Sequence, residues 1–113
     1  MKTDAKSIKM PPSIATYFNE DTHDAGRVAQ CFTENAVVID ERREHHGRPA
    51  IANWKAAATA KYHYTSEPTG IETTGTDLTV TARLVGDFPG SPVNLKYHFT
   101  LEDDKIARLE ITS

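Results

Sequence analysis

Hydrophobic residues recur with a helical period in the first half of the chain and alternate with polar residues in the second half. In three segments the apolar side chains lie three and four positions apart, so we expect helices over about residues 11–18, 24–32 and 49–61. Prolines near the start of the first and third segments fit a first helical turn, where no backbone N–H is required. The stripe positions are Ile14, Tyr17 and Phe18, then Val28, Cys31 and Phe32, then Ile51, Trp54, Lys55 and Ala58.

After residue 62 the period changes to two, which is typical of strands with one buried face. The expected strands cover residues 63–73, 78–85, 93–101 and 107–111. Pro68 and Gly70 interrupt the first of them, because neither residue suits the middle of a regular strand. The inward positions predicted by the alternation are Leu78, Val80, Ala82 and Leu84, then Val93, Leu95, Tyr97, Phe99 and Leu101, then Ala107, Leu109 and Ile111.

One short strand over residues 36–39 precedes the third helix and runs into the carboxylate of Asp40. Side chains alternate along a strand, so Asp40 shares a face with Val38 and lies next to apolar groups. Apolar surroundings raise the pKa of a carboxyl group and suit it to act as a base. Asp40 could equally cap the charged loop that follows over residues 41–46. At the end of that loop, His46 either lines the mouth of a cavity or bonds to the loop backbone.

Helices come first and strands last, an order that indicates an α+β fold with helices on one face of an antiparallel sheet. We expect residues 1–10 to form a flexible leader and residues 11–113 to form a single domain. A curved sheet packed on helices leaves room for a cavity, and such cavities are common ligand sites.

Composition excludes several classes of function. The net charge is -3, and the largest basic cluster, Arg42 with Arg43, has acids on both sides, so no nucleic-acid partner is expected. No apolar run approaches the roughly 20 residues that span a bilayer, and no secretory signal is recognisable, so we expect no membrane partner and a cytoplasmic location. The single cysteine, Cys31, excludes an intramolecular disulfide and is expected to be a buried apolar group.

No cofactor and no metal are expected. A glycine-rich phosphate loop is absent from the sequence. The neighbouring residues His45 and His46 point to opposite sides of an extended segment, so both could not easily bind one ion. His63 and His98 add no ligand spacing of a known metal class.

Two local patterns resemble the nuclear transport factor 2-like superfamily, which includes ketosteroid isomerases and SnoaL-like polyketide cyclases. Residues 32–40 read F-T-E-N-A-V-V-I-D, and residues 46–51 read H-G-R-P-A-I. The resemblance covers about residues 12–112. It implies a cone-shaped α+β barrel, in which about three N-terminal helices pack on a curved, mostly antiparallel sheet, and it implies a homodimer. Because this scaffold hosts isomerases, cyclases, dehydratases, hydrolases and non-catalytic binders, the patterns do not identify an activity.

In the ketosteroid isomerases that the chain resembles, the carboxylate at the end of this strand moves a proton beside a carbonyl, and Asp40 matches it. Their oxyanion hole uses a tyrosine of the first helix and a protonated aspartic acid of a late strand. Tyr17 lies near the position of that tyrosine. The position of the acid is occupied by Tyr97, so steroid isomerisation is not expected. Either tyrosine could donate to an oxyanion, and Tyr97 is preferred over Tyr62 and Tyr64 as a pocket residue because it is predicted to face inward.

We therefore expect a SnoaL-like protein that binds an apolar or cyclic small molecule, with Asp40, Tyr17 and His46 as catalytic residues. The expected ligand-binding residues are Val38, Trp54, Tyr97, Phe99 and Leu109. The expected reaction is proton transfer next to a carbonyl, as in isomerisation, cyclisation or dehydration. Two alternatives stay open: a binder without chemistry, and an interaction module that dimerises through the outward face of the last strands. An epoxide hydrolase of the limonene type is disfavoured, because Arg83 is predicted to face outward.

Overall fold

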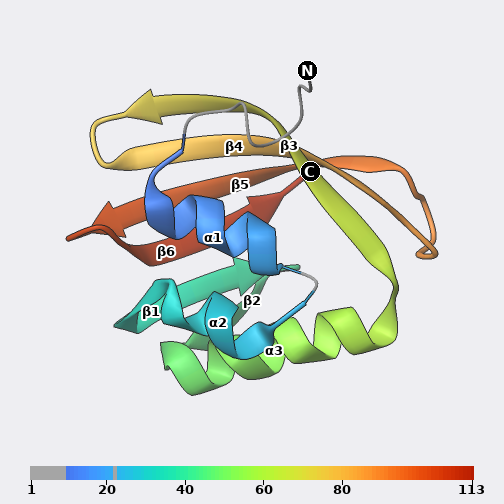
Figure 1. The fold of residues 1–113 in the computed structure, drawn as a ribbon, viewed down its shortest axis with the longest axis horizontal. Coiled ribbons are helices and arrows are strands. Elements are labelled where there is room, and N and C mark those ends of the chain that lie inside the picture. Colours follow the sequence, from blue (N-terminus) through green and yellow to red (C-terminus); the bar gives the residue numbers. More distant parts are fainter. Residues whose placement is uncertain (1–9, 22) are drawn as a thin grey trace.

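Three helices pack against one six-stranded sheet in the computed structural model, which describes residues 10–21 and 23–113 (Figure 1). The elements are α1 (Pro12–Glu20), α2 (Ala25–Gln30), β1 (Phe32–Asp40), β2 (Arg43–His46), α3 (Gly47–Lys61), β3 (Tyr64–Thr74), β4 (Asp77–Gly86), β5 (Val93–Glu102) and β6 (Lys105–Thr112). The strand order is β2-β1-β6-β5-β4-β3, and every neighbouring pair is antiparallel except β1 with β6. The predicted α+β class, with three helices followed by a mostly antiparallel sheet, is confirmed.

The first strand begins earlier than predicted. The second helix was expected to reach Phe32, but α2 ends at Gln30 and β1 begins at Phe32. Phe32 pairs with Ile106 of β6, and the register then shifts before Val37. Arg48 holds this irregular segment in place, because its Nε donates to the Phe32 carbonyl at 2.9 Å. The sequence therefore shows the alternation of a strand only after this register shift, from Val37 onward.

The charged loop predicted over residues 41–46 is a hairpin. Glu41 and Arg42 have φ angles of 55° and 65° and form a two-residue turn of the kind that joins twisted strands. Residues Arg43–His46 then pair with the end of β1 as the edge strand β2. The prediction of a loop was wrong because β2 carries only charged and imidazole side chains. Such residues suit an exposed edge but produce no hydrophobic alternation.

The core lies between the helices and one face of the sheet, to which β1, β4, β5 and β6 contribute buried side chains. Leu78, Val80, Ala82 and Leu84 face it from β4 as predicted. In β6 the predicted alternation is broken, since Ile106 and Leu109 are buried. The pairs Leu101 with Ile106 and Thr100 with Arg108 leave one extra residue between them, which is Ala107. This bulge changes the face of the residues before it, so the prediction that Ala107 shares a face with Leu109 was wrong.

The predicted leader falls almost wholly outside the described residues, and only Met10 of it is described, packed against the core. Within the described part of the chain, no helix is both long and apolar enough to cross a membrane.

Candidate functional site

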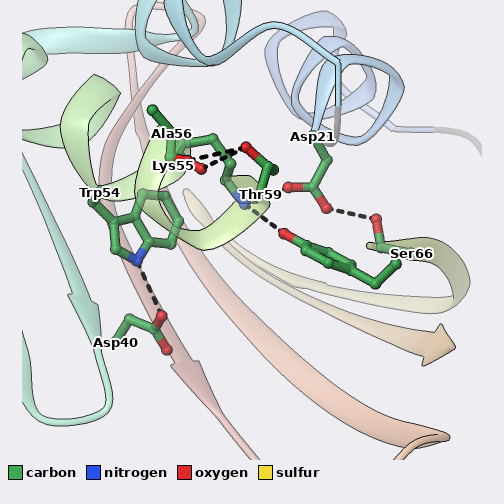
Figure 2. Close-up of polar contacts among 8 residues, drawn as sticks. Asp21, Asp40, Trp54, Lys55, Ala56, Thr59 and Ser66 are labelled. Atoms are coloured by element: carbon green, nitrogen blue, oxygen red, sulfur yellow. Dashed lines mark hydrogen bonds and ion pairs between the residues drawn. The ribbon is translucent and has the colours of Figure 1, made fainter. Parts of the chain in front are cut away.

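A lysine and an aspartate form an ion pair inside the fold. Lys55 belongs to α3 and Asp21 follows the end of α1, and their exposed fractions are only 3% and 1%. Lys55 lies on the same face of α3 as Ile51 and Trp54, so the helix cannot bury its apolar stripe without burying the lysine as well. Its Nζ donates to Oδ1 of Asp21, and Ser66 of β3 donates to Oδ2 at 2.6 Å (Figure 2). Both charges are therefore compensated, as buried charges must be.

The same ammonium group reaches Tyr64, the first residue of β3. Lys55 Nζ lies 3.5 Å from the Tyr64 hydroxyl oxygen and 4.5 Å from the centre of the Trp54 ring. Burial lowers the pKa of Lys55, but Asp21 and Tyr64 together raise it by more, so the pKa lies above its usual value. Lys55 is therefore charged at neutral pH. Burial raises the pKa of Tyr64 in spite of the opposing effect of Lys55, so Tyr64 is a neutral phenol.

Asp40 is held by the residue that precedes Lys55. The indole Nε1 of Trp54 donates to Oδ2 of Asp40 at 3.0 Å (Figure 2). Asp40 is the last residue of β1 and is only partly buried, so this bond fixes the carboxylate at the edge of the core. Because Trp54 and Lys55 are consecutive in α3, one turn of helix contacts both Asp40 and Tyr64.

Asp40 and Tyr64 line the same cleft, which has a volume of about 520 Å³ and is called the Asp40 cleft below. Its lining residues are Asp40, Glu41, Ala58, Lys61, Tyr62, Tyr64, Leu84, Phe88, Pro89, Gly90, Val93 and Leu95. Phe88 meets the rings of Tyr62 and Tyr64 edge-on, with centroids 6.1 Å and 6.4 Å away. Mostly apolar walls with a few polar groups are typical of small-molecule sites.

The structure places the other predicted catalytic residues away from this cleft. Tyr17 is 0% exposed, and its hydroxyl has no hydrogen-bond partner among the residues described. Its ring lies edge-on to Phe32 at 6.2 Å and to Phe99 at 5.7 Å. Burial raises the pKa of Tyr17 well above its usual value. His46 is exposed on β2, where its Nε2 lies 2.8 Å from Oε1 of Glu44.

The predicted ligand-binding residues lie in the packed core. Val38, Tyr97, Phe99 and Leu109 are buried, and burial raises the pKa of Tyr97 well above its usual value. Trp54 is also largely buried, but it borders a neighbouring hollow together with His45 and Asp40. Of the residues predicted for the site, the structure brings only Asp40 and Trp54 together at a cleft.

Sequence reasoning did not propose Asp21, Lys55 or Ser66 for the candidate site, and it ranked Tyr64 below Tyr97 as a pocket residue. Lys55 did carry a signal, because a charge on the apolar stripe of a helix requires a buried partner. Asp21 and Ser66 look like ordinary turn and strand residues, and only tertiary structure brings them to the lysine. Across residues 10–21 and 23–113, no group of three histidine, cysteine, aspartate or glutamate side chains is arranged to hold a metal ion.

Comparisons with known proteins agree with this architecture. The profile of the SnoaL-like domain family matches residues 15–109. A comparison with curated proteins found no match. Among solved structures, a provisionally named polyketide cyclase from Sinorhizobium meliloti is 38% identical and superposes with a TM-score of 0.88, over 97% of this chain and 100% of that chain.

Two more distant structures share the fold. A protein of ketosteroid isomerase-like fold from Catenulispora acidiphila, crystallised with trimethylamine, has a TM-score of 0.83 and 17% identity over 93% of this chain and 87% of that chain. An NTF2-like protein of unknown function from Cytophaga hutchinsonii has a TM-score of 0.71 and 15% identity over 98% of this chain and 92% of that chain. At these identities the similarity shows the fold alone.

Proposed function

The chain belongs to the SnoaL-like domain family, and on this premise we propose that it transfers a proton next to the carbonyl group of an apolar or cyclic compound bound in the Asp40 cleft. The observation that carries the proposal is the Asp40 carboxylate, held by Trp54 on the wall of a cleft that is otherwise mostly apolar. The cyclase name of the Sinorhizobium meliloti protein supports chemistry at a carbonyl.

The proposed reaction begins when Asp40 removes a proton from the carbon next to the carbonyl. The C–H bond breaks, an O–H bond forms on Asp40, and the carbonyl becomes an enolate. Asp40 then returns the proton to another carbon in an isomerisation. Alternatively, the enolate attacks a second carbonyl in a cyclisation, and Asp40 gives its proton to the alkoxide that forms. In a dehydration the enolate expels a hydroxyl group from the next carbon, and this group takes the proton of Asp40 and leaves as water. Trp54 fixes the orientation of the carboxylate during these steps. A base that is held in the right orientation transfers protons more efficiently.

The body of the substrate would contact the apolar side chains that line the Asp40 cleft, among them Leu84, Phe88 and Leu95. Tyr17 and Tyr97 have no direct part in this proposal, since both lie within the aromatic core. His46 has none either, because it pairs with Glu44 on the exposed edge strand.

Exchange of α-protons tests the proposal without knowledge of the natural substrate. The cyclic ketone 2-tetralone in D₂O, followed by NMR, should lose its α-protons faster with the protein than with buffer. Asp40→Asn removes the base but keeps an oxygen for the Trp54 N–H, so the exchange rate should fall by roughly 10²–10⁴-fold. Glu41→Gln is the matched control, because Glu41 lines the same cleft, whereas the Trp54 indole N–H donates to Asp40. No exchange above buffer with the wild type, or full exchange with Asp40→Asn, would overturn the proposal.

A second candidate is a binder of small organic cations that performs no chemistry. The trimethylamine in the Catenulispora acidiphila structure supports this candidate. So do the rings of Tyr62, Tyr64 and Phe88, which line the cleft together with the carboxylates of Asp40 and Glu41. Aromatic faces and carboxylates are the groups that recognise methylated ammonium ions. Calorimetric binding of tetramethylammonium that is lost in Asp40→Asn, without any α-proton exchange, would favour the binder.

A further inference from the structure

We infer that Tyr64 is the hydrogen-bond donor to the substrate oxygen, and that the buried pair Lys55–Asp21 positions its hydroxyl group for this role. The inference rests on the proposed function, because it assigns the partner of Asp40 in the same proton transfer. Tyr64 would be a catalytic residue, whereas Lys55 and Asp21 would act through it as positioning residues.

The first support is the placement of Tyr64. It lines the cleft that Asp40 also lines, although β3 and β1 are separated in the sheet by β4, β5 and β6. The helix α3 bridges this separation, because Trp54 bonds to Asp40 and the next residue, Lys55, bonds to Tyr64. A base and a donor held by adjacent residues of one helix keep a fixed relation to each other, which enolate formation requires.

The second support is the direction of the hydrogen bond between Lys55 and Tyr64. An ammonium group donates and cannot accept, so the Tyr64 oxygen must be the acceptor. The hydroxyl hydrogen of Tyr64 then has no role toward Lys55 and can point to a third group. Accepting a bond from a cation also makes the O–H a stronger donor. Because the pKa of Tyr64 is above its usual value, the hydroxyl keeps this hydrogen at neutral pH.

The third support is the way Lys55 is fixed. Its partner Asp21 is itself bonded to Ser66, which lies two residues after Tyr64 in β3. The strand that carries the phenol therefore also anchors the carboxylate that holds the lysine. Without Asp21, a lysine in this apolar position would lose its charge or leave the site.

Other tyrosines fit the role less well. Tyr17 and Tyr97 are buried among the rings of Phe18 and Phe99. Tyr62 lines the Asp40 cleft, but its ring contacts Lys61, whose Nζ lies 5.4 Å from the ring centre. Tyr62 is thus a matched control: the same side chain in the same cleft, bonded to no buried lysine among the described contacts.

The first experiment compares Tyr64→Phe with Tyr62→Phe in the exchange of 2-tetralone α-protons. Loss of one oxyanion donor typically lowers a rate by about 10²–10³-fold, so the rate of Tyr64→Phe should fall by that factor. Tyr62→Phe keeps the ring that lines the cleft and removes a hydroxyl group that is not assigned to the substrate oxygen, so its loss should be much smaller than that of Tyr64→Phe. If Asp40→Asn abolishes exchange while Tyr64→Phe leaves it intact, the assignment of Tyr64 is overturned and the proposed function stands. If the wild type itself catalyses no exchange, the proposed function fails and this inference fails with it.

The second experiment tests whether Lys55 and Asp21 act through Tyr64. The double variant Asp21→Asn/Lys55→Met removes both buried charges together, so folding is not compromised by an orphan charge. Its exchange rate should fall about tenfold or more, and adding Tyr64→Phe to it should cause much less further loss than Tyr64→Phe causes alone, because the effects of coupled residues are not additive. Fully additive losses would overturn the positioning role of the pair.

A spectroscopic readout separates this role from mere support of the fold. In Asp21→Asn/Lys55→Met, the phenolate absorbance of Tyr64, isolated by subtracting the spectrum of the same variant carrying Tyr64→Phe, should appear at higher pH than in the wild type. The reason is that Lys55 lowers the pKa of this phenol by more than Asp21 raises it, and the variant lacks both charges. An unchanged Tyr64 titration would show that Lys55 does not act on the hydroxyl and would overturn the inference.

Discussion

Lys55 is a charged residue that is buried in the core of this protein. It is buried on α3 together with Ile51 and Trp54, while its ammonium group contacts Asp21, Tyr64 and the rings of Tyr17 and Trp54. A lysine is rarely so deeply buried unless it is paired. Removing one partner therefore leaves the other as an uncompensated charge in the core.

We predict that Lys55→Met destabilises the protein by about 3–5 kcal/mol, because Asp21 stays buried without a counter-ion. Asp21→Asn should have a comparable effect for the same reason, whereas the double variant should recover most of the loss. Urea denaturation followed by circular dichroism measures all three free energies of unfolding. Lys61→Met is the control, since Lys61 is exposed and its replacement should change stability by less than about 0.5 kcal/mol. Equal stabilities for all variants would contradict the ion pair.

At the residue scale the sequence pointed to one residue of the candidate site, and its catalytic role stays a prediction. Asp40 stood out because it ends a short β-branched strand, and its position on the cleft agrees with the expected face. Tyr64 was ranked below Tyr97 because alternation reveals which side chains face inward but not which inward hydroxyls reach a cleft. Whether an inward hydroxyl group reaches a cleft depends on the packing around it, and the rings of Tyr17, Phe18 and Phe99 pack against Tyr97.

At the scale of elements, β4 and β3 come unusually close at the start of β3. A Cβ atom built on Gly86 would lie 2.5 Å from Cβ of Tyr64 and would also overlap the carbonyl oxygen of His63. Only a glycine fits there without a backbone shift. The position of Tyr64 in the Asp40 cleft thus depends on a residue in the neighbouring strand.

We predict that Gly86→Ala costs about 1–3 kcal/mol of stability, as overpacking commonly does, because the new methyl group must push β3 away. The same shift should reduce α-proton exchange by displacing Tyr64. Thermal or urea unfolding and the exchange assay measure the two effects. Gly70→Ala is the comparison, because no atom lies within 4 Å of its Cβ position. A Gly86→Ala protein as stable and active as the Gly70→Ala protein would contradict the close approach.

The elements that were predicted correctly are those whose hydrophobic residues recur at a regular spacing. Periodicity placed α3, β4 and β5 because each carries a regular apolar face. The strand β2 could not be found in this way, since its stability comes from pairing with β1 and from the turn at Glu41 and Arg42. Bulges in β1 and β6 shift the alternation, and their positions depend on the partner strand rather than on local composition.

For the whole molecule, burial of titratable groups ties stability to alkaline pH. Burial raises the pKa of Tyr17 and Tyr97 well above the usual 10.0. The pKa of Lys55 also lies above its usual 10.5, because burial lowers it by less than Asp21 and Tyr64 together raise it. The folded protein therefore keeps protons that the unfolded chain releases once the pH passes these usual values.

We predict that the free energy of unfolding falls as the pH rises above about 10, since the unfolded state then binds fewer protons than the folded state. The stabilisation is fully present below the unfolded pKa values and is lost toward the raised folded values. Denaturant titrations between pH 8 and about pH 11 test this. Tyr17→Phe removes one titrating group and should flatten the decline. A stability that stays constant or rises over this range would contradict the buried phenols.

The homodimer implied by the family resemblance stays a prediction at this scale. The outward face of the last strands is polar: Lys96 is exposed, and His98 is bonded to Thr79 and Thr112 across three strands. Light scattering of the wild type measures whether two copies associate. Variants with substitutions at Lys96 and His98 test whether they associate through this face.

The indole that orients Asp40 is also the only tryptophan of the chain. Its emission should depend on the carboxylate and on the ammonium group beside the ring. Ultraviolet fluorescence therefore gives this protein an intrinsic optical sensor, without any label. Libraries of candidate compounds could be screened by quenching or spectral displacement long before a turnover assay exists.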